Sequence, residues 1–174
     1  LLMLDTRQYG RDRQIQPKEY LTQSGFNQAK FYNELNSKNR ELIGSEQLAW
    51  IENSVVKTDA VWTIFGQQVL MAKLKFPDLS KMIASEEIPS FLKPYLKFLG
   101  LGIPSNLDAW DGYPAERNKL YKLMNSANKK FISLAGDTHN SWVSELEDLS
   151  GKKVGVELGA PSVTSPGITD ILSL

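Results

Sequence analysis

The segment Gly136-Asp137-Thr138-His139-Asn140-Ser141 carries the strongest chemical signal in the chain. It combines a carboxylate with the only histidine of the sequence, and both groups are good ligands for divalent or trivalent metals. Residues two apart in an extended segment point the same way, roughly 6.6 Å apart. The two metals of a binuclear hydrolase lie about 3.5–4 Å apart, so Asp137 and His139 could each contact one of two neighbouring ions. The alternative is a capping aspartate and a loop histidine, and two ligands are too few for a complete metal site.

A second candidate group follows the apolar residues that open the chain. The segment Leu4-Asp5-Thr6-Arg7-Gln8-Tyr9 contains an arginine that could bind a phosphate through two hydrogen bonds. Arg11 and Arg13 add positive charge nearby. Arg7 is therefore a candidate substrate-binding residue. The alternative is an ordinary surface ion pair, for example between Asp5 and Arg7.

A third candidate segment runs from Asp108 to Arg117 and is dense in aromatic and charged residues. Trp110 and Tyr113 are candidate substrate-binding residues that could stack on a nucleoside or sugar, or could only brace the loop. Either Asp108 or Asp111 could cap the following helix or order the loop, and Arg117 could pair with either. Paired carboxylates also occur in glycosidases, but a short loop fixes no separation between them.

Composition excludes several other classes of function. The sequence has no cysteine, which excludes disulfides and Cys-ligated zinc within these residues. Lys+Arg and Asp+Glu are 20 each, so the basic excess that is typical of a nucleic-acid binder is missing. No apolar run approaches the roughly 20 residues of a membrane helix. The sequence also lacks a phosphate-binding P-loop, a G-x-G-x-x-G fingerprint and a G-x-S-x-G nucleophile elbow.

The elements that must position these groups alternate between strands and helices. At 174 residues, of which 41% are hydrophobic, the chain fits a single globular domain. The pattern predicts a long irregular connection over 5–44 and a Pro/Gly-rich excursion over 76–106. It predicts helices over 46–57 with Ser45 as N-cap, over Gln67–Lys75, and over Ala115–Asn128. It predicts strands at Leu1–Leu4, Ala60–Phe65, Phe131–Ala135, Trp142–Leu146 and Val154–Leu158. This order indicates an α/β fold, in which ligand sites collect at strand ends.

The first residues suggest that the chain is part of a longer protein. No initiator Met stands at position 1, and the apolar run Leu1–Leu4 is typical of a buried strand that has been cut. We therefore expect unpaired edges and exposed apolar surface, both of which promote self-association.

Taken together and in this order, the segments resemble the PhoD-type alkaline phosphatases, a branch of the calcineurin-like metallophosphoesterases. The resemblance spans nearly the whole chain, and DAWDGYPAER followed by GDTHNS is its specific part. The matching residues are LDTR at 4–7 with Gln8-Tyr9, GSEQLAW at 44–50, GQQV at 66–69, DAWDGYPAER at 108–117, LAGDTHNS at 134–141, Val156-Glu157 and SVTS at 162–165.

The resemblance implies a fold and a chemistry. The fold is a β-sandwich flanked by helices, a four-layer α/β/β/α arrangement, of which residues 1–174 would be the C-terminal half. The chemistry is hydrolysis of phosphomonoesters or phosphodiesters by metal-activated water, with iron and calcium as cofactors. Asp137 would be the ligand on the calcium side and His139 the ligand on the iron side, which makes both catalytic. The resemblance also implies a periplasmic, secreted or cell-surface location.

The chain departs from the family pattern in its ligands. The earlier Asp, Asp-Tyr-Arg and Asn motifs of the family lie before the LDTR strand, and here nothing precedes Leu1. The cysteine ligand of some members is absent too. We therefore expect the 174 residues alone to be inactive. The alternative from a different class is a non-catalytic α/β binding module in which the GDTHNS loop is only structural.

Overall fold

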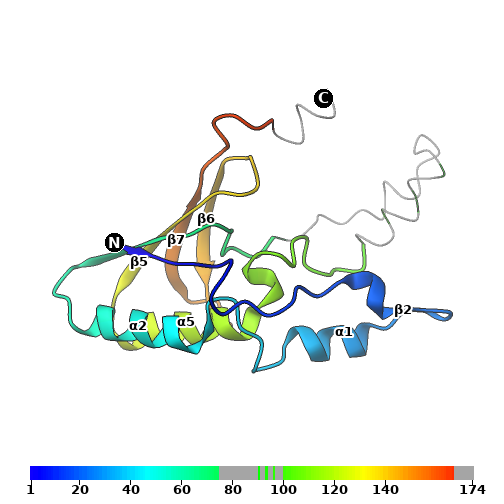
Figure 1. Cartoon of the computed structure of the whole chain (residues 1–174), viewed down its shortest axis with the longest axis horizontal. Coiled ribbons are helices and arrows are strands. Elements are labelled where there is room, and N and C mark those ends of the chain that lie inside the picture. Colours follow the sequence, from blue (N-terminus) through cyan, green and yellow to red (C-terminus); the bar gives the residue numbers. More distant parts are fainter. Residues whose placement is uncertain (75–89, 91–92, 94–95, 97–99, 167–174) are drawn as a thin grey trace.

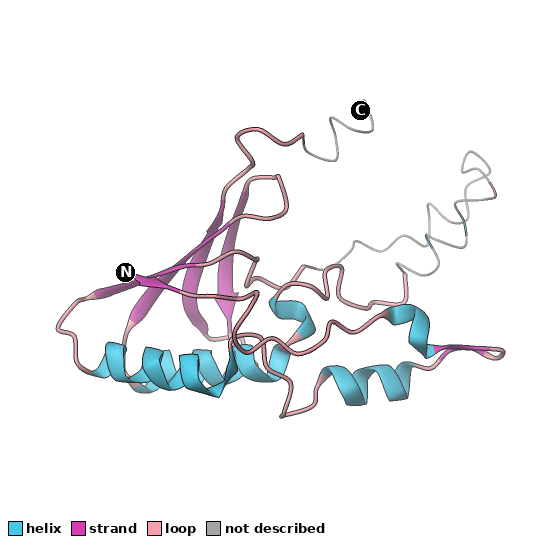
Figure 2. Cartoon of the chain, viewed as in Figure 1, coloured by secondary structure: helices cyan, strands magenta, loops and turns pink. Residues whose placement is uncertain are grey.

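The computed structural model describes residues 1–74, 90, 93, 96 and 100–166, and this part of the chain is mixed α/β (Figures 1 and 2). Its main sheet has five strands in the order β1-β4-β5-β7-β6. The first four are parallel to one another, and β6 is antiparallel to β7. The five predicted strands are confirmed, with bounds β1 Leu2–Met3, β4 Trp62–Gly66, β5 Lys130–Ala135, β6 Trp142–Glu147 and β7 Lys153–Gly159.

Two helices cover one face of this sheet. Helix α2 (Gly44–Val56) and helix α5 (Pro114–Ser126) lie next to each other along it (Figure 1), and both confirm predicted helices. The buried core between helices and sheet contains Phe65 and Phe131, whose ring centroids are 5.3 Å apart. Burial of such apolar surface is the main source of folding free energy. No described helix is long and apolar enough to cross a membrane.

The opposite face of the sheet exposes a row of apolar side chains and carries no described helix (Figure 2). Neighbouring strands align Leu134 with Leu158, and Leu158 with Val143, in one row across the sheet. All three side chains are exposed, as is Val156 on the same face. Because adjacent residues of a strand point to opposite faces, the same strands bury Phe131 and other side chains beneath the helices.

The N-terminal connection is more regular than the sequence pattern predicts. Residues 5–44 were expected to be irregular, and this is wrong for 17–35. That stretch forms a 3₁₀ turn and a two-stranded hairpin before helix α1 (Gln28–Leu35), with bounds η1 Pro17–Tyr20, β2 Leu21–Thr22 and β3 Gly25–Phe26. Asn27 caps α1 by accepting a hydrogen bond from the Lys30 N–H at 3.0 Å. Phe31 and Leu35 anchor this helix in a second, smaller core.

The helix expected over Gln67–Lys75 is wrong for 67–74, which form a loop, while Lys75 lies outside the described residues. Hydrogen bonds to a distant side chain explain the difference. The backbone N–H groups of Met71 and Ala72 donate to the buried carboxylate of Glu157 at 2.7 and 2.8 Å. Those donors are therefore not available for a helix.

The expected N-cap of α2 at Ser45 is also wrong. The helix begins two residues earlier than expected, at Gly44; Ile43 occupies the N-cap position, and Ser45 is exposed. The carboxylate of Glu116 in α5 replaces the cap: it accepts hydrogen bonds from Leu42, Ile43 and Gly44, the last two at 2.9 and 3.0 Å. Burial raises the pKa of Glu116, although these bonds act to lower it.

Candidate functional site

The carboxyl ends of three parallel strands form the edge of the sheet where the predicted chemical segments meet. The loops after β1, β4 and β5 are tied together by backbone hydrogen bonds, for example from Gly136 N–H to the Gln68 carbonyl at 3.3 Å. This is the edge at which ligands bind in open α/β sheets. The prediction that the polar segments follow strand ends is therefore confirmed for the loops that carry Arg7 and Asp137.

The side chain of Gln68 aligns the first loop with the second. Its Oε1 accepts hydrogen bonds from the Thr6 N–H at 2.9 Å and the Thr6 hydroxyl at 2.7 Å. Its Nε2 donates to the Leu4 carbonyl at 3.2 Å. From the sequence alone, this amide is only a weak candidate for a functional residue. In the structure it forms hydrogen bonds to the residues on either side of Asp5.

Arg7 joins all three chemical segments. Its Nη1 donates to Asp108 at 2.5 Å and its Nη2 donates to Asp137 at 2.8 Å. The alternative pairing with Asp5 is not what forms, because the Asp5 carboxylate instead accepts the Arg7 backbone N–H at 2.7 Å. Burial acts to lower the pKa of Arg7, but the hydrogen bonds and charges of Asp108 and Asp137 outweigh it and raise the pKa.

The other carboxylate of the third segment has a separate, buried partner. Asp111 forms an ion pair with Arg117 at 2.7 Å, and both side chains are almost completely buried. Asp111 also accepts the Leu74 N–H at 2.9 Å. Of the roles that the sequence left open, Asp111 therefore orders the loop, while Asp108 is free to pair with arginines of the first segment.

Trp110 and Tyr113 are fully buried, so the structure supports bracing rather than stacking on a substrate. The Trp110 indole N–H donates to Gln67 Oε1 at 2.6 Å. The Tyr113 hydroxyl donates to the Asp12 carbonyl at 2.8 Å. The guanidinium of Arg11 lies over the Tyr113 ring, 5.3 Å from its centroid, so this face of the ring is occupied. Burial raises the pKa of Tyr113.

The loop after β5 exposes both candidate metal ligands. Asp137 and His139 adopt left-handed backbone conformations, with φ of 74° and 59°. Such conformations are costly for residues other than glycine and occur often at functional sites. Between the two residues, the Thr138 hydroxyl accepts the Trp142 indole N–H at 2.9 Å and fastens the loop to β6.

The hydrogen bonding of His139 suits a metal ligand. Its Nδ1 lies 3.0 Å from the Pro166 carbonyl, and a carbonyl only accepts, so Nδ1 donates this hydrogen bond; in the neutral ring, Nε2 then presents its lone pair. A metal-bound histidine is commonly oriented in this way. The Asp137 carboxylate is a second possible metal ligand, although its Oδ1 already accepts a hydrogen bond from Arg7. No group of three or more possible ligands occurs among the described residues. The two residues therefore fit part of a metal site.

A buried polar chain behind the site is not predicted by the sequence patterns. Gln67 donates to the Ser133 hydroxyl at 2.7 Å, and that hydroxyl donates to Glu157 at 2.8 Å. Burial raises the pKa of Glu157 against the lowering effect of its hydrogen bonds. The one sequence signal is a carboxylate inside an otherwise apolar strand, which must find partners when buried.

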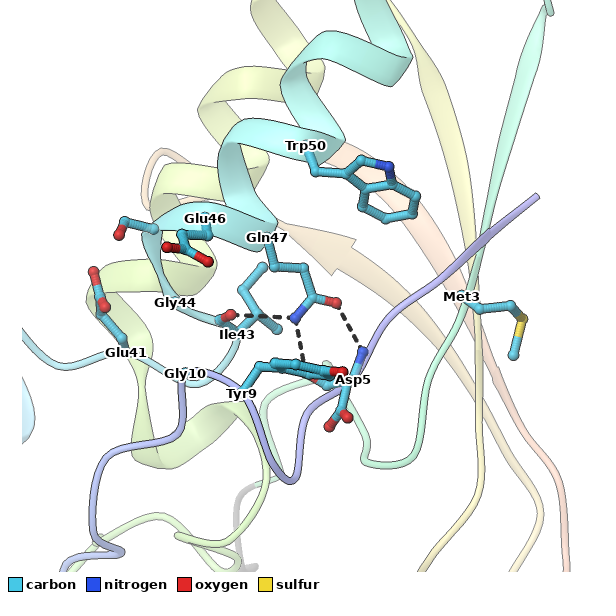
Figure 3. Close-up of a pocket in the computed structure, with 11 residues that line it drawn as sticks. Met3, Asp5, Tyr9, Gly10, Glu41, Ile43, Gly44, Glu46, Gln47 and Trp50 are labelled. Atoms are coloured by element: carbon cyan, nitrogen blue, oxygen red, sulfur yellow. Dashed lines mark hydrogen bonds between the residues drawn. The ribbon is translucent and has the colours of Figure 1, made fainter.

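A pocket of about 580 Å³ lies on the other side of the first loop, against α2, and Figure 3 shows the residues that line it. Gln47 fixes the loop there: its Oε1 accepts the Asp5 N–H at 2.8 Å and its Nε2 donates to the Asp5 carbonyl at 2.9 Å. The lining contains Asp5, Glu41 and Glu46 but no lysine or arginine. A phosphate would be repelled by this lining, so the pocket is not the site for an anion.

Comparisons with known proteins confirm the resemblance that the sequence segments indicate. The family model described as PhoD-like phosphatase matches residues 1–173. Alkaline phosphatase D of Bacillus subtilis (strain 168) is 32% identical over 170 residues, which are 95% of this chain and 24% of that protein. A solved chain described as "Structure of PhoD" matches with a TM-score of 0.63 and 29% identity, over 94% of this chain and 26% of that one.

The chain thus spans about a quarter of the length of these relatives. The family match nevertheless includes all three segments that Arg7 brings together, and it extends over almost every residue. The chain belongs to the PhoD-like phosphatase family.

Proposed function

We propose that this chain forms part of the active site of a metal-dependent phosphoesterase, which hydrolyses phosphomonoesters or phosphodiesters by metal-activated water. The observation that carries the proposal is the meeting of Arg7, Asp137 and His139 at one edge of the sheet. This edge offers a cation for phosphate beside possible ligands for metals. The family resemblance also supports export to the periplasm or cell surface.

The metals that the family implies are iron and calcium. Asp137 would serve the calcium side and His139 the iron side, with further ligands from outside the described residues. When bound, such ions activate water and offset the charge of the phosphate. The hydrogen bond from His139 to Pro166 supports this role, because it leaves Nε2 as the coordinating atom.

Arg7 would bind the phosphate of the substrate. A guanidinium has five N–H donors, and the ion pairs with Asp108 and Asp137 engage one each from Nη1 and Nη2. Donors therefore remain for phosphate oxygens. Trp110 and Tyr113 would not contact the substrate, since neither ring is exposed. Their role would be to hold the loop of Asp108 in place.

We propose the four-layer sandwich for the complete domain, with this chain as one half. The support is the row of exposed apolar side chains at Leu134, Leu158 and Val143, on the sheet face that no described helix covers. A second sheet packed on that face would bury the row. Relatives about four times longer than this chain have sequence to supply it.

The uncovered face predicts self-association of the 174-residue chain. Light scattering is expected to show dimers or larger species, because burying the row removes apolar surface from water. Leu158→Lys is expected to shift the chain toward monomer. The matched control is Leu149→Lys, at a residue that is 75% exposed in the turn after β6. A wild-type chain that is strictly monomeric and melts cooperatively would count against the sandwich.

The proposed function is tested by comparing this chain with the full-length protein that contains it. The full-length protein is expected to hydrolyse p-nitrophenyl phosphate or its bis ester at alkaline pH with iron and calcium, and to lose this activity to a chelator. The 174-residue chain is expected to match a blank, because two ligands cannot fix two metals. Chelator-sensitive turnover by the chain alone would contradict the hypothesis that it carries only part of the active site. A full-length protein without turnover on either ester would favour the binding module.

A further inference from the structure

Asp108 lies between two guanidinium groups and uses a different oxygen for each. Its Oδ2 accepts from Arg7 at 2.5 Å, and its Oδ1 accepts from Arg11. Asp108 and Asp137 pair with different terminal nitrogens of the Arg7 guanidinium, Nη1 and Nη2 respectively. The orientation of Arg7 is therefore fixed at two points.

Arg11 is the better anchored of the two arginines. Its side chain is 13% exposed, compared with 34% for Arg7. It also donates to the Asp108 carbonyl at 2.9 Å and the Thr6 carbonyl at 3.2 Å, and it lies over the buried ring of Tyr113. Arg11 thus holds both the backbone and the side chain of Asp108, and Asp108 in turn holds Arg7.

The charges around Arg7 balance, and this makes the role of Asp108 measurable. Two arginines face two carboxylates, Asp108 and Asp137. If only net charge mattered, removing the charge of Asp108 would strengthen phosphate binding. If Asp108 positions Arg7, the same change removes the ion pair at Nη1 and leaves the guanidinium held only by Asp137. Phosphate binding would then weaken. The two explanations predict opposite signs.

We propose that Asp108 is a positioning residue for phosphate recognition: anchored by Arg11, it holds the Arg7 guanidinium beside Asp137 with its remaining donors directed to a phosphate oxygen. This proposal rests on the proposed function for its ligand, but the Asp108–Arg7 geometry on which it depends can be tested separately. Asp108 itself does not contact the substrate.

The first test uses side-chain NMR of the 174-residue chain and needs no activity. The Arg7 Nε–Hε group is expected to be ordered in the wild type and mobile in Asp108→Asn, with the backbone spectrum unchanged. Asp108→Glu keeps the charge and is expected to restore much of the order. The matched control is Glu19→Gln, which removes the partner of Arg13 away from the site. An Arg7 signal that stays ordered in Asp108→Asn would overturn the proposal.

The second test measures inhibition by inorganic phosphate in the full-length protein. Asp108→Asn is expected to weaken inhibition at least about fivefold, a range typical of residues coupled by contact. In an Arg7→Gln background it should add nothing, because Asp108 acts through Arg7. Stronger inhibition in Asp108→Asn, or a full additional loss in the Arg7→Gln background, would overturn the proposal. A wild type without turnover or phosphate inhibition contradicts the proposed function instead, and the NMR result then still decides whether Asp108 positions Arg7.

Discussion

His139→Ala is expected to lower phosphoester hydrolysis by the full-length protein at least about a hundredfold, or roughly 2.7 kcal/mol in transition-state stabilisation. The reason is that an imidazole whose Nε2 is held ready by the Pro166 carbonyl would be lost as a ligand. Asp137→Asn is expected to act similarly, because it removes a charge while nearly keeping the shape. Losing metal removes both water activation and charge compensation.

The measurement is turnover per folded molecule together with metal content by elemental analysis. Stability is expected to fall little, because both residues are exposed in a loop. The matched control is Thr138→Val, which lies between them and loses only the hydrogen bond from Trp142. It should lower the melting temperature slightly and keep its metal. Retained metal and near-normal turnover in both site variants would show that the loop is structural.

Glu116→Ala is expected to cost about 3–5 kcal/mol of unfolding free energy. It leaves three buried N–H groups at the start of α2 without their acceptor. For a chain of this size, that corresponds to a melting temperature lower by about 6–20 °C. Glu46→Ala is the matched control, because Glu46 is exposed in the first turn of the same helix. It should cost only about 0.3–1 kcal/mol.

The raised pKa of Glu116 adds a pH signature to this prediction. The folded chain holds the Glu116 proton to higher pH than the unfolded chain does, so the unfolding free energy falls as pH rises from the ordinary value of 4.5 through the folded pKa. Glu116→Gln cannot titrate at this position. Urea unfolding between about pH 4 and 7 measures the unfolding free energy of both proteins. The amount by which Glu116→Gln is less stable than wild type is expected to shrink as pH rises. A stability difference that stays constant or grows with pH would contradict a raised pKa of Glu116.

Local patterns in the sequence were sufficient for the elements that bury apolar residues at regular spacing. The five strands and the helices α2 and α5 were predicted within about two residues at most ends. Helix α1 is not predictable from the apolar pattern, because only Phe31 and Leu35 mark its buried face. The segment 67–74 was assigned wrongly because its backbone donors bond to Glu157, 85 residues or more away in sequence.

The candidate site was predictable in its parts but not in its connections. Residue types alone singled out Arg7, Asp137 and His139, because carboxylate, imidazole and guanidinium have limited chemistry. They could not show that Arg7 bridges Asp108 and Asp137, since those ion pairs join residues 101 and 130 positions apart. Nor could they assign the capping of α2 to Glu116, which contacts it across 72 to 74 positions.

The ion pair between Arg7 and Asp137 also has a consequence for the time at which the site can exist. The ribosome adds about 5–20 residues per second, and Asp137 follows Arg7 by 130 positions, so it is made roughly 6–26 seconds later. Closing a short loop takes well under a microsecond, so synthesis and not diffusion sets this delay. Until Asp108 is made, 101 positions after Arg7, the nascent chain carries Arg7 and Arg11 without either of the carboxylates that pair with them in the folded chain.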